Sequence, residues 1–277
     1  MSKRQAGISG RLVIDRIEKH YDNIVRCEIM KKALVVGGSN GIGIAIAKNM
    51  ISRNYYVIIV DRVAPDEKAA IPSDSYSFYA CDLTNMDNGV FEKLAGDKEI
   101  EFLMITAGFG RVTNFENLSF SEIENMIMVN TLAGIKIIRA FYSRIQHDKD
   151  FYCGMMGSIA GLISSPMFSV YAASKAAICR FIESVNIELE VNGSTNRILN
   201  VSPGSIKGTR FNGGDNDFSL TRQLAEEIVT HVFKKDQLFI PEYDNVFKGV
   251  LERYHADPHA FGVSSYEYKL KSGRVRN

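Results

Sequence analysis

The chain of 277 residues has no tryptophan, six prolines and four cysteines, and the cysteines lie far apart without a CxxC pair. The N-terminal segment carries scattered charges and lacks an apolar signal core, so it does not resemble a secretory leader. We therefore interpret the cysteines as reduced thiols and expect a cytoplasmic protein.

The chain also lacks an excess of charge of either sign. Its formal net charge of +1 argues against a nucleic-acid partner, and no apolar run approaches the length that spans a membrane. His255 and His259 are four residues apart, but Pro258 stands between them and spoils a helical ligand pair, so we expect no metal site. Hydrophobic residues make up 45% of the chain, which is ample for a core.

Three regions differ in pattern. Residues 1–29 form an N-terminal extension with apolar residues near helical spacing, and residues 30–250 form the expected catalytic domain. Residues 251–277 form a tail rich in tyrosine and basic residues. This tail either lies over a neighbouring subunit or is a disordered end.

From residue 31 onwards, short β-rich runs alternate with longer helical patterns. The first runs are almost entirely apolar, which is typical of strands buried on both faces of a parallel sheet. The alternation predicts an α/β protein, a single doubly wound Rossmann-type domain with a central parallel sheet. Strands are expected at 32–38, 55–61, 76–82, 101–108, 152–158, 197–204 and 238–242, and a loop followed by a helix at 205–240.

A glycine-rich turn, GGSNGIG, joins the first predicted strand to the first predicted helix. Glycine allows a tight turn and close approach of the backbone, and a helix N-terminus attracts a pyrophosphate. We predict a dinucleotide site here, made by Gly37, Ser39, Asn40, Gly41, Ile42 and Gly43.

Asp61 ends the second predicted strand, and Arg62 follows it. A carboxylate at this place accepts hydrogen bonds from ribose hydroxyls and repels a 2′-phosphate, which favours NAD. Arg62 is able to bind a 2′-phosphate, so NADP remains the alternative cofactor.

Tyr171 and Lys175 are four residues apart on a predicted helix and therefore share one face. A lysine ammonium near a phenol lowers the pKa of the phenol, and such a tyrosine exchanges a proton with a carbonyl or alcohol oxygen. Ser158, at a strand-to-loop junction upstream, is placed to hydrogen-bond that oxygen. Without Ser158 upstream, the Tyr–Lys spacing would be only weak evidence for a catalytic pair.

The glycine loop, the Ser158–Tyr171–Lys175 order and the SPG segment together resemble the short-chain dehydrogenase/reductase family over residues 31 to 250. The chain departs from the family pattern at Val36, where the family usually has Thr, and in ITAG, which lacks both asparagines of the family's NNAG. The resemblance implies a catalytic set of Asn130, Ser158, Tyr171 and Lys175. In this set Asn130 holds a water that links the lysine to solvent.

The resemblance also implies further cofactor contacts. Asp82 and Leu83 would lie at the adenine, although Asp82 equally suits a helix cap. Tyr171 and Lys175 would also contact the nicotinamide ribose. The remaining expected contacts are Ala107, Gly108, Pro203, Gly204, Ile206 and Thr209.

The implied function is hydride transfer between a nicotinamide cofactor and a small-molecule carbonyl or secondary alcohol. Apolar pocket candidates are Met167, Phe168 and Phe211. The alternatives are an NADPH-dependent 3-oxoacyl thioester reductase and a non-catalytic dinucleotide-binding regulatory protein. Relatives in this family are commonly dimers or tetramers, so a homo-dimer or homo-tetramer is expected.

Overall fold

A computed structural model describes residues 31–209, 211, 217–273 and 275, so the predicted N-terminal extension lies outside the described residues. Seven parallel strands form one sheet in the order β3-β2-β1-β4-β5-β6-β7. This order reverses direction between β1 and β4, as in a doubly wound sheet. The strands are β1 Lys32–Val36, β2 Tyr56–Asp61, β3 Tyr76–Ala80, β4 Ile100–Ile105, β5 Tyr152–Met156, β6 Ile198–Val201 and β7 Leu238–Phe239.

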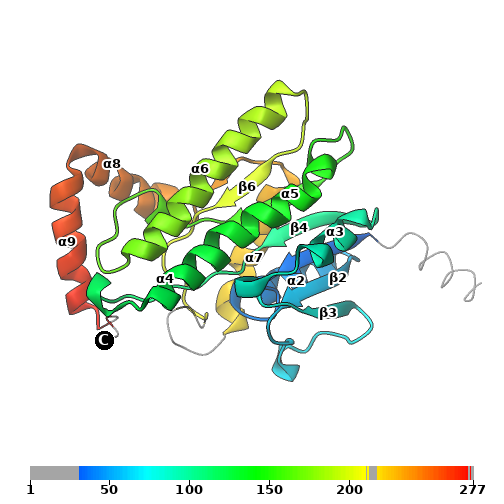
Figure 1. The fold of residues 1–277 in the computed structure, drawn as a ribbon, viewed down its shortest axis with the longest axis horizontal. Helices are drawn as coiled ribbons and strands as arrows, with labels where there is room; N and C mark the ends of the chain where they lie inside the picture. The colour runs from blue at the N-terminus through cyan, green and yellow to red at the C-terminus, as the bar shows by residue number, and fades with distance from the viewer. Residues whose placement is uncertain (1–30, 210, 212–216, 274, 276–277) are drawn as a thin grey trace, which may run out of the picture.

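Two layers of helices cover the sheet (Figure 1). Alternate strand residues face opposite layers, so Leu34 and Val36 pack toward α3, α5 and α6, while Ala33 and Val35 pack toward α2 and α7. Both faces are therefore buried, which explains the nearly unbroken apolar runs of the central strands. These helices are α2 Gly41–Ser52, α3 Asn88–Gly96, α5 Ala133–Ile145, α6 Ser169–Val191 and α7 Phe218–Phe233.

The helical stretch that carries Asn130 is not one regular helix. It consists of α4 (Phe120–Ile127), a π-helical turn (Met128–Leu132) and α5. Ser119 and Glu122 form a reciprocal capping box that starts α4. A π-helical turn inserts an extra residue into the helix and is frequent at functional sites; Asn130 lies inside this one and is fully buried.

The chain continues after β7 into α8 (Lys248–Ala256) and α9 (Pro258–Lys271). Asp257 caps α9 by accepting a hydrogen bond from the Ala260 N–H, and Pro258 occupies the first turn. The predicted tail is thus helical as far as Lys271, and Figure 1 shows both helices beside the N-terminal end of α6. His255 and His259 fall on different helices.

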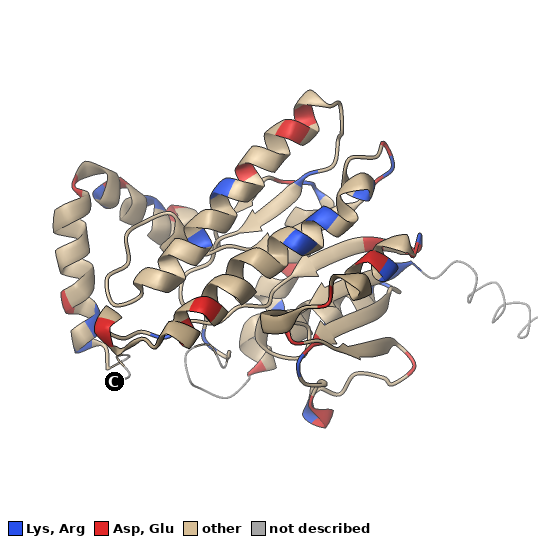
Figure 2. Cartoon of the chain, in the orientation of Figure 1, with Lys and Arg blue, Asp and Glu red and all other residues tan. Residues whose placement is uncertain are grey.

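Basic and acidic residues are mixed along the ribbon (Figure 2), in keeping with the small net charge. Across the described part of the chain, no helix is both long and apolar enough to cross a membrane.

Candidate functional site

The glycine loop is packed tightly against the end of β4. Gly37 has φ +81°, and a Cβ there would lie 2.5 Å from the Ala107 nitrogen. A Cβ on Gly43 would lie 2.1 Å from the Gly37 carbonyl oxygen. The Thr106 hydroxyl donates to the carbonyls of Val36 and Gly37, at 3.0 Å each. Thr106 therefore braces the loop, a role that the sequence analysis missed and that the ITAG segment itself would have suggested.

A dinucleotide fits the polar groups of this loop. Ser39 is 2% exposed, and its hydroxyl has no hydrogen-bond partner, so a buried polar atom is left for a ligand. The Ser39 N–H donates to Asp61 Oδ2 at 3.0 Å, which fixes the carboxylate at the loop. Asn40 precedes α2, whose first residues are Gly41, Ile42 and Gly43, so the loop ends at a helix N-terminus. These features suit a phosphate and ribose-binding segment.

At the opposite end of the predicted cofactor site, Asp82 caps a 3₁₀ turn. Its Oδ1 accepts hydrogen bonds from the Thr84 N–H at 2.9 Å and from the Thr84 hydroxyl at 2.8 Å. These bonds lower the pKa of Asp82, and the nearby Arg62 charge acts in the same direction. The capping role considered from sequence is therefore present, while Leu83 is buried in the core. Arg62 is exposed and approaches Asp82 from the end of β2.

The β5–α6 connection brings Ser158, Tyr171 and Lys175 together. Ser158 follows β5, and its hydroxyl is hydrogen-bonded with Tyr171 and lies 3.5 Å from the Pro203 carbonyl. Lys175 Nζ lies 5.8 Å from the centroid of the Tyr171 ring and donates to the Met156 carbonyl at 2.8 Å. All three side chains are at most 7% exposed. The site therefore consists of one hydroxyl, one phenol and one amine that are all buried.

Burial is the main influence on the pKa values of Tyr171 and Lys175. It raises the pKa of Tyr171 to about 12, although the hydrogen bond from Ser158 acts in the opposite direction. Burial likewise lowers the pKa of Lys175 to about 8. The expectation that Lys175 lowers the pKa of Tyr171 is thus not met. The physical reason is that both groups are removed from water, while the lysine is directed to the Met156 carbonyl and not to the phenol.

Asn130 is engaged by protein groups on both sides. Its Oδ1 accepts from the Phe109 N–H, and its Nδ2 donates to the Phe109 carbonyl, each at 2.9 Å. Nδ2 also donates to Ser174 Oγ at 3.0 Å, and Ser174 Oγ donates to the Tyr171 carbonyl at 2.7 Å. A Cβ on Gly108 would lie 3.2 Å from both Asn130 Oδ1 and Lys175 Nζ. Asn130 therefore lies next to the lysine and ties the π-helical turn to the segment after β4; Ser174 was not anticipated.

The segment after β6 closes the site from another side. The Pro203 carbonyl accepts from the Ile159 N–H at 3.0 Å, and a Cβ on Gly204 would lie 2.3 Å from the Phe247 ring. The Thr209 hydroxyl donates to the Ile206 carbonyl at 3.2 Å. A Cβ on Gly41 would lie 3.4 Å from Thr209 Cγ2, so this segment reaches the glycine loop. The structure thereby brings together the predicted cofactor residues that follow β1, β4 and β6.

Aromatic rings cover Tyr171. Phe168 stacks on it with a centroid distance of 4.1 Å and an interplanar angle of 20°, and the Phe211 centroid lies 5.3 Å away. Gly110 is pressed against both stacked rings, since a Cβ there would lie 2.7 Å from each. Phe168 and Phe211, predicted as pocket residues, are therefore in contact with the proposed acid–base group.

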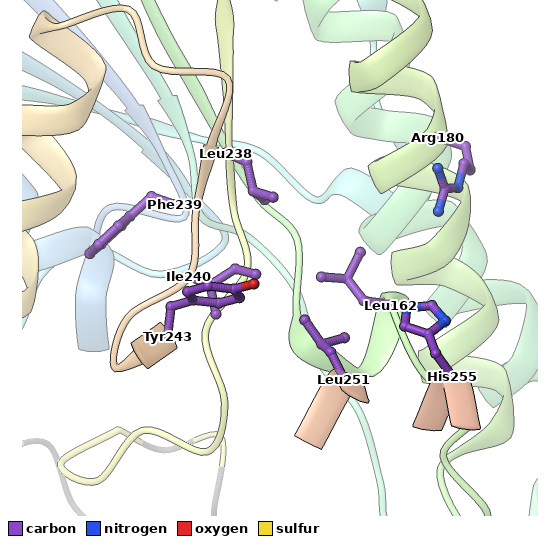
Figure 3. Close-up of a pocket in the computed structure, with 8 residues that line it drawn as sticks. All are labelled: Leu162, Arg180, Leu238, Phe239, Ile240, Tyr243, Leu251 and His255. Carbon is purple, nitrogen blue, oxygen red and sulfur yellow. The ribbon is translucent and has the colours of Figure 1, made fainter. Parts of the chain in front are cut away.

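A separate cavity of about 480 Å³ lies between β7, α6 and α8 (Figure 3). Its apolar wall faces two basic side chains, Arg180 of α6 and His255 of α8. Its lining consists of Leu162, Arg180, Leu238, Phe239, Ile240, Tyr243, Leu251 and His255, and it shares no residue with the predicted site.

Comparisons with known proteins identify the family of this chain. Residues 31–219 match the family model described as short chain dehydrogenase. An uncharacterized oxidoreductase of Saccharomyces cerevisiae is 26% identical over 187 residues, which are 65% of this chain and 61% of the relative. A very-long-chain 3-oxoacyl-CoA reductase of Ajellomyces capsulatus is 27% identical over 58% of this chain and 51% of the relative.

Solved structures share the fold. A short-chain dehydrogenase from Streptomyces avermitilis superposes with a TM-score of 0.69 at 22% identity, over 86% of this chain and 99% of the other. A short-chain dehydrogenase from Sphingobium yanoikuyae, in complex with NADPH, superposes with a TM-score of 0.65 at 22% identity. The superposition covers 82% of this chain and 96% of the other.

The family match covers more than half of the chain, so the chain belongs to the short-chain dehydrogenase family. The predicted family and the α/β Rossmann-type fold are confirmed. The chain spans only 60–61% of the length of several curated relatives that it matches.

The buried lysine leads to a stability prediction. Lys175→Met is expected to raise the free energy of unfolding at pH 7 by about 2 kcal/mol. The depressed pKa of the lysine corresponds to a cost of about 3 kcal/mol, and the lost hydrogen bond to Met156 offsets about 1. Urea unfolding at pH 7 measures the difference.

The pH dependence of this difference follows from the same pKa. Between pH 8 and pH 10.5 the folded chain releases the Lys175 proton while the unfolded chain keeps it, so the stability of the wild type rises relative to the variant. The difference in the free energy of unfolding between Lys175→Met and the wild type should therefore be smaller at pH 10 than at pH 7. A wild type more stable than Lys175→Met at pH 7 would contradict the cost assigned to this lysine.

Proposed function

We propose that the chain catalyses reversible hydride transfer between NAD(H) and a carbonyl or secondary-alcohol carbon. The observation that supports this most is the contact of Ser158, Tyr171 and Lys175 at the same edge of the sheet as the glycine loop. Gly37 approaches Ala107, and Gly108 in turn approaches Lys175, so this one segment lies against both the glycine loop and the acid–base group.

The cofactor, when bound, supplies or accepts the hydride. The chain's own groups handle the proton and the oxygen. The Ser158 hydroxyl orients the substrate oxygen, and Tyr171 gives its phenolic proton to that oxygen. A Tyr171 pKa of about 12 keeps this proton on the phenol at neutral pH, which is the form that donates to a carbonyl oxygen. We assign Asn130 the role of holding a water that links Lys175 to solvent as a proton relay.

The test is a screen of ketones and secondary alcohols with each nicotinamide nucleotide, followed by the absorbance of the reduced form. Carbonyl-dependent oxidation of NADH is expected. If neither nucleotide changes redox state with any compound while both bind, the non-catalytic regulatory alternative replaces this proposal.

A second candidate is an NADPH-dependent 3-oxoacyl thioester reductase. It is favoured by the 3-oxoacyl-CoA reductase among the relatives and by the apolar cover over Tyr171, which suits an acyl chain. A 3-oxoacyl thioester in the screen, turned over faster with NADPH than any ketone with NADH, would select this candidate.

Asp61 is proposed to select NAD over NADP. Asp61→Asn removes the charge but keeps an amide oxygen that accepts from the Ser39 N–H. The ratio of the NADPH and NADH dissociation constants is expected to fall about tenfold, because a 2′-phosphate no longer meets a carboxylate. Calorimetric titration of both nucleotides measures this ratio. An unchanged ratio would show that Asp61 does not select between NAD and NADP, and Arg62 would be the next residue to test.

We also propose a cytoplasmic homo-dimer or homo-tetramer assembled through α5 and α6. On α6, Ile187 is 59% exposed and Val191 is 81% exposed, which supports this surface as a subunit contact. Sedimentation velocity of the purified chain decides the oligomeric state.

A further inference from the structure

Lys269 of α9 reaches into the segment between β5 and α6. Its Nζ donates to Ser165 Oγ at 2.7 Å and to the Pro166 carbonyl at 2.8 Å. Both partners belong to residues 162–168, called here the cover loop. Lys269 is partly buried, and this burial lowers the pKa of its amine to about 8. The residue lies beyond the part of the chain that matches the family model.

The same face of α9 touches the cover loop a second time. A Cβ on Gly262 would lie 3.7 Å from Ser164 Oγ and 3.9 Å from Pro166 Cγ. Gly262 and Lys269 are seven residues apart, which places them on one face two turns apart. The helix therefore runs along the cover loop, which it approaches at Gly262 and to which it is hydrogen-bonded through Lys269.

The residues that follow Pro166 in the cover loop form a constrained turn over the site. Met167 has φ +60°, a left-handed conformation that a non-glycine residue keeps only where the surroundings enforce it. Its carbonyl accepts from the Thr113 N–H at 2.8 Å, and the Phe168 N–H donates to the Ser165 carbonyl at 3.0 Å. Phe168 then stacks on Tyr171.

We propose that Lys269 is a positioning residue of the substrate site, which holds the cover loop in the turn that seats Phe168 on Tyr171. Lys269 thereby fixes the apolar wall beside the reacting carbonyl and limits the bulk of the ketone that the site accepts. The part of this inference that concerns substrate rests on the proposed hydride-transfer function.

The first test needs no substrate. Hydrogen exchange of the Phe168 and Thr113 amides is compared between the wild type, Lys269→Met and Lys269→Arg. We expect exchange at both amides to become about tenfold faster in Lys269→Met, with exchange in α9 and the melting temperature nearly unchanged, and to be restored in Lys269→Arg. Lys271→Met is the matched control, because Lys271 lies on the same helix with an exposed side chain.

Unchanged exchange at Phe168 and Thr113 in Lys269→Met would overturn the proposal. A loss of protection throughout α9 would also overturn it, because Lys269 would then only hold its own helix. If Lys269→Met does not fold, Ser165→Ala removes one acceptor from the loop side, and faster exchange at the same two amides is again expected.

The second test separates this inference from the proposed function. With the ketone that the wild type reduces fastest, Lys269→Met is expected to raise KM for the ketone about fivefold and leave nucleotide binding unchanged. Faster loop exchange in a chain that reduces no ketone would keep the positioning role and refute the hydride-transfer function. Normal KM and normal exchange in an active variant would refute the positioning role alone.

Discussion

Tyr171→Phe is expected to lower kcat about 1,000-fold, because it removes the only phenolic proton proposed to reach the substrate oxygen. The ring remains, so its stacking with Phe168 should persist. Nucleotide binding should change by less than about twofold, since the lost hydroxyl is directed to Ser158 and not to the glycine loop. Steady-state kinetics and a nucleotide titration of the same preparation measure both quantities.

Tyr152→Phe is the matched control for this substitution. Tyr152 lies on β5, and its hydroxyl contacts the exposed Asp150 carboxylate at 3.4 Å, away from Ser158 and Lys175. This variant should retain wild-type kcat. Normal turnover in Tyr171→Phe would remove Tyr171 from the mechanism, and an equal loss in both variants would indicate a general defect of the fold.

Gly43→Ala is expected to weaken nucleotide binding about 100-fold and to destabilise the fold by about 2 kcal/mol. The added Cβ would lie 2.1 Å from the Gly37 carbonyl oxygen and 2.6 Å from Thr106 Oγ1. The first contact is with backbone, so the loop itself must open. Calorimetric nucleotide titration and urea unfolding report the two effects.

Gly96→Ala provides the control for Gly43→Ala. Gly96 ends α3, and a Cβ there would meet nothing within 4 Å. The same added methyl should therefore leave binding unchanged and stability unchanged or slightly higher. Wild-type nucleotide affinity in Gly43→Ala would show that the tight loop geometry is not needed for the ligand.

The sheet was predictable because its signals are local. The predicted strands at 32–38, 55–61 and 101–108 read as apolar runs, and the structure forms β1, β2 and β4 there, mostly buried on both faces. Two of the strands end sooner than predicted, β1 at Val36 and β4 at Ile105, because the chain turns there into the loops that line the site. The pair Tyr171–Lys175 was likewise predictable, because spacing along one helix decides which residues share a face. The glycine loop was predictable from the spacing of its glycines between a strand and a helix.

Features that depend on long-range packing were not predictable. The pKa of Tyr171 is raised by burial, and burial depends on elements distant in the sequence, such as the segment around Gly110 that lies against the Tyr171 ring. The bond between Lys269 and Ser165 joins residues 104 positions apart. Asn130 was found by resemblance, but its partners Phe109 and Ser174 appear only once the π-helical turn is in place.

The most direct measurement is a titration of the wild-type chain with NADH and with NADPH, followed by the fluorescence of the nucleotide. The chain has no tryptophan to interfere with this signal. We predict saturable binding of NADH below about 1 mM and weaker binding of NADPH, because the Asp61 carboxylate is held at the glycine loop. Tighter NADPH binding would overturn the role of Asp61, and failure of both nucleotides to bind would contradict the nicotinamide-dependent function.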